Sequence, residues 1–140
     1  MQENCIRVGI GFATGRKSFQ NVLRSYVYHL EESGFVVPGR VSLTLLVAFD
    51  PAYSGTTRAD YEDMEPRVKR WFDDMAFFSP EDVQNAAEAL VQRGVASENE
   101  KHLLFGNGYA AQRNIVLYEA MRRHLDNLIF FDDDEYPMAV

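Results

Sequence analysis

The segment from Val41 to Phe49 constrains the fold more strongly than any other part of the sequence, because one face is apolar throughout and the other is apolar in its second half. Large apolar side chains occupy alternate positions along it, and Leu46 and Ala48 lie between them on the other face. A strand with two apolar faces is typical of a parallel sheet that helices cover on both sides. We therefore predict a three-layer, Rossmann-like α/β domain with a mainly parallel sheet.

The preceding segment predicts the first strand and the first helix of this domain. Residues 6–12 alternate bulky with small side chains, which is the period-two pattern of a strand. Ser18 stands at the N-cap position of a helix whose apolar residues run from Phe19 to Leu30, and Gly34 ends that helix. A strand, a helix and a strand with short joints imply a right-handed parallel crossover.

The middle of the chain predicts a loop followed by two helices. Residues 51–63 are polar and form the loop. A helix that begins near Pro66 carries apolar side chains inward as far as Met75, and a second helix follows an N-cap at Ser79. Residues 103–105 are apolar and suggest a short third strand, although a segment of that length also suits a helix.

The last third of the chain predicts a helix and then a buried strand. The helix follows Gly108, and its apolar stripe consists of Ala110, Leu117, Met121 and Leu125, widened by Ala111, Ile115 and Tyr118. Residues 128–131 are continuously apolar, as in a fully buried strand of a parallel sheet. That strand runs directly into the acidic residues 132–135.

Composition narrows the classes of function. The chain has 140 residues, enough for one domain over 1–140, and its net charge of -7 opposes binding to nucleic acid. Cys5 is the single cysteine, so we expect no disulfide framework and a reducing, cytoplasmic location. No apolar run approaches the roughly 20 residues that a membrane span needs, so we expect no membrane-spanning segment.

Polar residues that follow three predicted strands should meet at one edge of the sheet. They are the loop from Thr14 to Lys17, Asp50 and the acidic run 132–135. Ligands of open parallel α/β sheets bind beyond the carboxyl ends of the strands. A basic loop beside several carboxylates suits a nucleotide diphosphate with Mg²⁺ or Mn²⁺, because these hard cations prefer oxygen ligands.

Two motifs in the last third resemble the family-2 glycosyltransferases and their GT-A relatives. The first is the segment 108–114, in which Arg113 and Asn114 open a helix. The second is the buried strand that ends in an Asp-x-Asp motif at residues 132–134. The resemblance covers the last third of the chain by motif and the remainder by architecture only. It implies a GT-A fold and a metal-dependent transfer of sugar from a nucleotide-diphosphate sugar to an unknown acceptor.

The resemblance also implies roles for individual residues. Asp132 and Asp134 match the motif acids that bind the metal, and Asp132 also contacts the sugar nucleotide, as does Asp133 between them. Asp50 matches the acid that contacts the base. The remaining candidates for nucleotide-sugar binding are Ala13, Thr14, Arg16, Arg113 and Asn114.

Several readings stay open beside this assignment. The chain matches no acceptor-side catalytic base, so we expect a domain incomplete at its C-terminus, a segment of a longer enzyme that binds nucleotide but transfers no sugar. A sugar-1-phosphate nucleotidyltransferase and a noncatalytic nucleotide- or metal-binding module are the alternatives. Asn114 equally suits a structural hydrogen bond, Asp50 a turn cap, and Arg16 a solvated loop position.

Geometry yields two further expectations. The first strand should lie between the second and the last, which brings Thr14, Asp50 and Asp132 to one edge. If the last strand stays extended past Phe131, Asp132 and Asp134 face one way and Asp133 the other.

The glycines at positions 9 and 11 fit poorly to a dinucleotide fingerprint, because they lie within the strand pattern.

Overall fold

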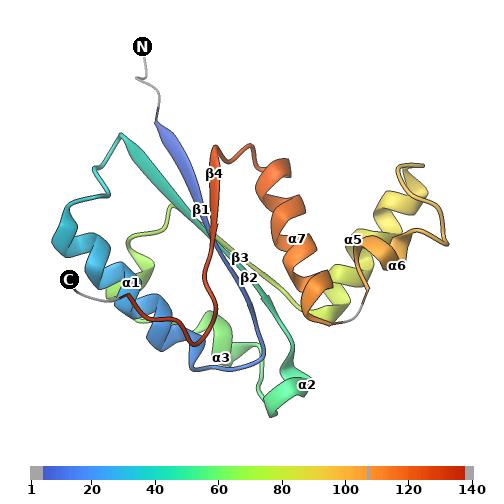
Figure 1. Cartoon of the computed structure of the whole chain (residues 1–140), viewed down its shortest axis with the longest axis horizontal. Helices are drawn as coiled ribbons and strands as arrows, with labels where there is room; N and C mark the ends of the chain where they lie inside the picture. Colours follow the sequence, from blue (N-terminus) through green and yellow to red (C-terminus); the bar gives the residue numbers. More distant parts are fainter. Residues whose placement is uncertain (1–4, 107, 138–140) are drawn as a thin grey trace.

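The computed structural model describes residues 5–106 and 108–137, which form an α/β fold around one four-stranded sheet (Figure 1). Its strands are β1 (Ile6–Thr14), β2 (Val41–Phe49), β3 (Asp74–Phe78) and β4 (Asn127–Phe130). Their order is β3-β2-β1-β4, and every neighbouring pair is parallel. The predicted α/β class and parallel sheet are therefore confirmed.

Strand β1 lies between β2 and β4 in the sheet. Its residue Ile10 pairs with Leu45 of β2 on one side and with Ile129 of β4 on the other. The expectation that the first strand lies between the second and the last is thus confirmed. Because all strands run the same way, their carboxyl ends open on one edge.

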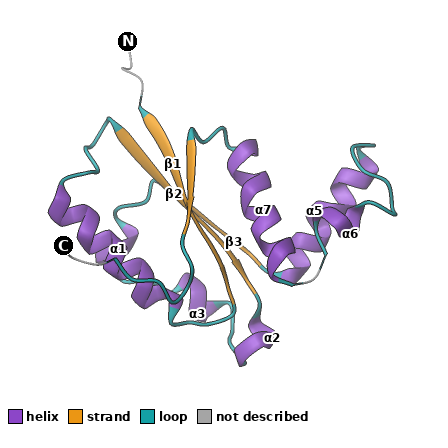
Figure 2. Cartoon of the chain, viewed as in Figure 1, coloured by secondary structure: helices purple, strands orange, loops and turns teal. Residues whose placement is uncertain are grey.

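One face of the sheet packs on helix α1 (Phe19–Ser33), as Figure 2 shows. Phe12 of β1 contacts Phe19 edge-on, with ring centroids 5.5 Å apart. Gly34 ends α1 in the left-handed conformation, as predicted. Ser18 is the N-cap residue, as predicted, but its backbone is already helical and its side chain makes no cap hydrogen bond.

The other face is covered by α5 (Pro80–Gln92) and α7 (Tyr109–Arg122) (Figure 2). Helices on both faces make the three predicted layers. Ser79 caps α5 in a reciprocal capping box with Asp82, so the helix start predicted there is confirmed.

The structure differs from three local expectations in the middle of the chain. The helix at Pro66 is a single turn, α4 (Pro66–Lys69), and the chain then enters β3, which contains Met75. The predicted loop 51–63 contains two one-turn helices, α2 (Pro51–Ser54) and α3 (Ala59–Glu62), and the short apolar segment near 103 forms helix α6 (Lys101–Leu104) instead of a strand. Pairing with β2 decides β3, because Asp73 already donates its backbone N–H to the Leu43 carbonyl, 2.9 Å away.

The buried side of α7 also differs from the predicted stripe. Leu117 and Met121 are exposed, and the buried residues are Ala111, Ile115, Val116, Glu119 and Ala120. Val116 lies where β1 has Gly11: a Cβ at Gly11 would be 2.7 Å from the Val116 Cγ1 atom. Gly11 therefore lets the helix pack closely on the sheet, and this close approach helps select the buried side of α7.

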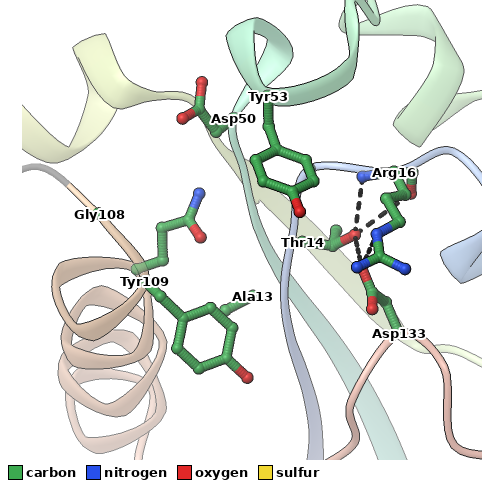
Figure 3. Close-up of a pocket in the computed structure, with 10 residues that line it drawn as sticks. Ala13, Thr14, Arg16, Asp50, Tyr53, Gly108, Tyr109 and Asp133 are labelled. Atoms are coloured by element: carbon green, nitrogen blue, oxygen red, sulfur yellow. Dashed lines mark hydrogen bonds and ion pairs between the residues drawn. The ribbon is translucent and has the colours of Figure 1, made fainter.

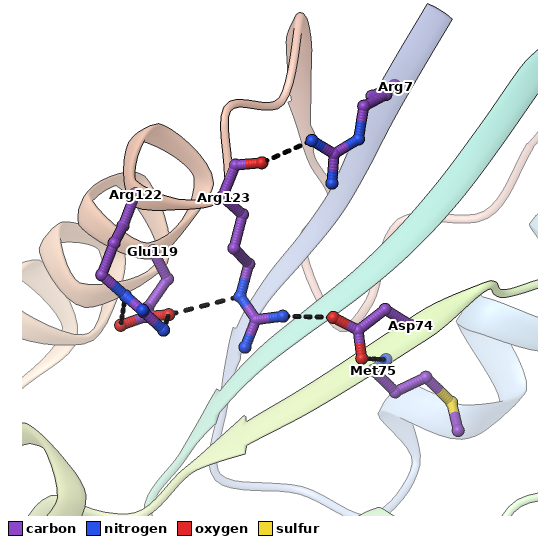
Figure 4. Close-up of polar contacts among 6 residues, drawn as sticks. All are labelled: Arg7, Asp74, Met75, Glu119, Arg122 and Arg123. Carbon is purple, nitrogen blue, oxygen red and sulfur yellow. Dashed lines mark hydrogen bonds and ion pairs between the residues drawn. The ribbon is translucent and has the colours of Figure 1, made fainter. Parts of the chain in front are cut away.

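Buried Glu119 is neutralised by two arginines at the end of α7 (Figure 4). Arg122 donates to it at 2.8 Å and Arg123 at 3.3 Å. Arg123 also pairs with Asp74 of β3, and its carbonyl accepts a hydrogen bond from Arg7 of β1 at 2.8 Å. This network ties the C-terminus of α7 to the amino ends of two strands.

Strand β4 is less buried than its apolar sequence predicts. It lies at the edge of the four-stranded sheet in the part of the chain that the structure describes, and Ile129 is exposed. Full burial requires neighbours on both sides of a strand as well as helices on both faces.

Among the described helices, none combines the length and the apolar character that crossing a membrane requires.

Glu31 of α1 gives the fold a dependence on pH. Arg67 and Arg70 donate to its carboxylate at 2.7 and 2.5 Å, and Trp71 donates at 3.3 Å. The hydrogen bonds from Arg67 and Arg70 lower the pKa of Glu31 from 4.5 to about 2. Because the pKa is lower in the folded state, the stabilisation is complete above pH 4.5 and is lost as the pH falls towards 2.

We expect Glu31→Gln to lower the melting temperature at pH 7, and the difference from wild type to shrink as the pH falls from 4.5 to about 2. Thermal unfolding followed by circular dichroism between pH 7 and pH 2 measures this. Glu32→Gln, at the exposed neighbouring position, is the matched control. A difference between wild type and Glu31→Gln that stays constant over this range would contradict the assignment.

Candidate functional site

A cavity of about 300 Å³ opens at the carboxyl edge of the sheet (Figure 3). It lies between the ends of β1 and β2, the N-terminus of α7 and the acidic run. Its lining residues are Ala13, Thr14, Gly15, Arg16, Asp50, Tyr53, Gly108, Tyr109, Gln112 and Asp133. The structure thus brings the three predicted polar groups to one edge, as the strand order requires.

The floor of the cavity is the junction between β1 and β2. Asp50 donates its backbone N–H to the Thr14 carbonyl at 3.0 Å, which continues the strand pairing by one residue. One oxygen of the Asp50 carboxylate accepts the backbone N–H of Ala52 at 3.0 Å and caps α2. Asp50 therefore caps a turn, as one of its two sequence readings predicts, and it also lines the cavity.

Thr14 joins the first loop to the acidic run. Its hydroxyl donates to the Asp133 carboxylate at 2.8 Å and accepts the backbone N–H of Arg16 at 3.1 Å. The Arg16 side chain lies 3.8 Å from the same carboxylate oxygen. The Arg16 side chain is 48% exposed whereas that of Asp133 is 15% exposed, so the guanidinium is accessible to a ligand and the carboxylate is largely enclosed.

The acidic run turns at the end of β4. Phe131 still donates to the Gly11 carbonyl at 3.0 Å, but Glu135 then donates its N–H to the Asp132 carbonyl at 3.3 Å, which closes a turn. The extended alternation of Asp132, Asp133 and Asp134 is therefore not present. Asp133 lines the cavity, whereas Asp132 and Asp134 are not among the residues that line it.

Asp132 is held by the first turn of α7. The Tyr109 hydroxyl donates to its carboxylate at 2.9 Å. Burial, together with that hydrogen bond, raises the pKa of Tyr109. The charge of Asp132 also raises the pKa of Glu135, with burial and Asp134 adding to the effect. The turn thus carries a local excess of negative charge.

The carboxylates of residues 132–135 are suitable ligands for a divalent cation, but they are not arranged as a metal site. Within residues 5–106 and 108–137, no three His, Cys, Asp or Glu side chains are grouped closely enough to hold a metal ion. The donors are carboxylate oxygens, which hard cations prefer.

The structure places Arg113 and Asn114 outside the cavity lining. Arg113 stacks over the rings of Tyr109 and Phe130, with its guanidinium carbon 5.4 and 4.8 Å from their centroids. Asn114 donates to the Leu104 carbonyl at 2.8 Å, which is the structural reading of that residue. These two residues support the N-terminus of α7 beside the acidic run.

Sequence reasoning missed Tyr53, Gln112 and the role of Gly15. Tyr53 lies in a segment that carries no recognised motif, and Gly15 is where the ring of Tyr53 passes over the first loop. The absence of a side chain at position 15 beside a strand end was the available signal. Arg16 lies 5.9 Å from the Tyr53 ring centroid, and Tyr53, followed by Asp133, raises the pKa of Arg16.

A second cavity of about 270 Å³ adjoins the first and shares Asp50, Gly108 and Gln112 with it. Its other lining residues are Phe49, Ala52, Pro80, Val83 and Gly106. Asp50 therefore stands between a compartment that contains Arg16 and a largely apolar compartment.

Comparison with protein-family models, with curated proteins and with solved structures found no match to this chain. The geometry of the cavity and the motif resemblance at residues 108–134 are the observations that bear on function.

Proposed function

We propose that this domain binds the nucleoside diphosphate of a nucleotide sugar and serves a metal-dependent glycosyltransferase of the GT-A type. The observation that carries the proposal is the cavity at the carboxyl edge, where Thr14, Arg16 and Asp50 meet Asp133. This edge is where open parallel sheets bind nucleotides. The location is cytoplasmic in this proposal, and the acceptor is unknown.

Arg16 is the cavity residue best suited to the diphosphate. Its guanidinium is half exposed at the mouth of the cavity, and its salt bridge to Asp133 at 3.8 Å is loose enough to exchange for a phosphate. Planar guanidinium groups bind phosphate oxygens with paired hydrogen bonds. The hydrogen bond from the Arg16 backbone N–H to the Thr14 hydroxyl keeps the loop in position while the Arg16 side chain exchanges Asp133 for the phosphate.

Asp132 and Asp134 would hold Mn²⁺ or Mg²⁺ beside this diphosphate. The cation would neutralise charge on the leaving diphosphate when the glycosyl bond breaks. In this proposal Asp133 keeps its hydrogen bond to Thr14 and fixes the turn in which its two neighbours lie. Tyr109 orients Asp132 through its hydroxyl.

Thermal-shift measurements with ADP, CDP, GDP and UDP, each with Mn²⁺, test the proposal. A ligand that binds only the folded state stabilises it by about 1.4 kcal/mol when its free concentration is ten times its Kd. At least one nucleotide should therefore raise the melting temperature. Arg16→Gln should weaken that nucleotide about tenfold, because it removes a charge-assisted phosphate contact. Arg40→Gln, an exposed arginine at the amino end of β2, is the matched control. No shift with any of the four nucleotides would contradict the proposal.

A further inference from the structure

We propose that the ring of Tyr53 is the platform on which the nucleobase of the bound nucleotide stacks. This inference rests on the proposed function and adds the residue that recognises the base. Tyr53 belongs to α2, lines the cavity and leaves 68% of its surface exposed. Covering an exposed aromatic ring with a planar ligand removes apolar area from water on both partners.

The platform is fixed from behind by the first loop. A Cβ placed on Gly15 would lie 2.5 Å from the Cβ, 2.7 Å from the Cγ and 2.8 Å from the Cδ1 of Tyr53. Ser54, the next residue, donates its hydroxyl to the Gly15 carbonyl. A ring held in place before binding loses little conformational freedom when the ligand arrives, which strengthens stacking.

The surroundings of Tyr53 separate a base side from a phosphate side. Arg16 and Asp133, together with the Thr14 hydroxyl, form the charged side, towards which the Tyr53 hydroxyl points (Figure 3). Ala13 and Gly108 are small residues on the lining, and small side chains let a flat ring approach closely. Because Arg16 lies only 5.9 Å from the ring centroid, a base on the ring and a diphosphate on Arg16 fit one nucleotide.

The alternative occupant of the platform is the sugar of the donor, whose C–H groups also pack on aromatic rings. The position of the charged side chains beside Tyr53 favours the base over the sugar as the group that stacks on the ring. A nucleoside diphosphate places its base and its phosphates at opposite ends of the ribose, which matches the arrangement of Tyr53 and Arg16. The sugar lies beyond the diphosphate and would have to fold back to reach Tyr53.

Calorimetric titrations with Mn²⁺ test the inference on three probes: the best of the four nucleoside diphosphates, its nucleotide sugar with glucose, and inorganic pyrophosphate. Tyr53→Ala should weaken the nucleoside diphosphate about tenfold, because stacking of one base contributes about 1–3 kcal/mol. Its affinity for pyrophosphate should stay within about twofold of wild type. Tyr53→Phe keeps the ring and should bind all three probes like wild type.

Gly15→Ala supplies a second variant, in which Tyr53 is present but its ring is displaced by the added Cβ. It should weaken the nucleoside diphosphate severalfold. Phe35→Ala, an exposed aromatic residue in the segment before β2, is the matched control and should change nothing. A melting temperature close to that of wild type establishes that each variant is folded.

The outcomes separate the inference from the proposed function. Binding of the nucleoside diphosphate with equal affinity by wild type and Tyr53→Ala would overturn the platform and leave the proposed function standing. A loss seen only with the nucleotide sugar, or an equal loss in Tyr53→Phe, would also overturn it, in favour of the sugar or the hydroxyl. Failure of the wild type to bind any nucleoside diphosphate would overturn both.

Discussion

Gly11→Ala should destabilise the protein by about 2 kcal/mol, because the helix α7 leaves no room for a side chain at this position of β1. The added Cβ would lie 2.7 Å from Val116 Cγ1 and 3.3 Å from Phe130 Cδ1. Val116 is fully buried, and its branched side chain has one strongly preferred rotamer in a helix, so it cannot turn away. Chemical denaturation with urea, followed by circular dichroism, measures the loss.

Two further variants make this expectation specific to the helix contact. Gly9→Ala should cost less than Gly11→Ala, because its Cβ would meet the ends of flexible leucine side chains, those of Leu125 and Leu128. In the double variant Gly11→Ala/Val116→Ala the clash is absent, so its free energy of unfolding should exceed the value expected from adding the two single losses. Strict additivity would contradict the contact.

The sheet could be predicted from the sequence because the pattern of a strand is carried by residues that are adjacent in the chain. The apolar faces of β2 and the alternation in β1 specify a parallel sheet covered on both sides, and the structure has both. The convergence of Thr14 and Asp50 on one edge follows from strand direction alone. Such features need no knowledge of how individual helices pack.

The errors occurred where distant contacts decide local structure. Residues 74–78 suit a helix in isolation and become β3 by pairing with β2. The buried side of α7 includes Val116, which packs against Gly11 of β1, about a hundred residues earlier in the chain. The predicted apolar stripe of α7 is therefore correct for Ala111 and Ile115 and wrong for Leu117 and Met121, and the helix itself is confirmed.

The candidate site was predictable in its position but only partly in its residues. Thr14, Arg16, Asp50 and Asp133 line the cavity as expected. Tyr53 was missed because its only signal is the lack of a side chain at Gly15, which has meaning only when the two loops are seen together. The turn at 132–135 was missed because the alternation was extended beyond the last paired residue of β4.

Asp134→Asn should weaken Mn²⁺-dependent binding of the nucleotide at least tenfold, which corresponds to about 1.4 kcal/mol. The substitution removes one of the two carboxylates proposed to hold the cation. It should leave the fold intact, because Asp134 is exposed beyond the end of β4. Affinity without metal should change little, since Asp134 is not among the residues that line the cavity.

Asp133→Asn should give a different pattern from Asp134→Asn. Asp133 holds Thr14 at 2.8 Å and approaches Arg16, so its loss loosens the first loop and should weaken the nucleotide with or without Mn²⁺. The effect should be smaller than that of Asp134→Asn in the presence of metal, because the amide can still accept the Thr14 hydrogen bond. Asp73→Asn, an exposed acid at the opposite end of the sheet, is the control.

The measurement that tests the acidic run most directly is calorimetric titration of the nucleotide into wild type and Asp134→Asn, each with and without Mn²⁺. We predict that wild type binds more tightly with Mn²⁺ and that Asp134→Asn loses most of this gain while keeping the metal-free affinity. Equal affinities of the two proteins in Mn²⁺ would contradict the metal assignment and leave residues 132–135 as a solvated end of β4.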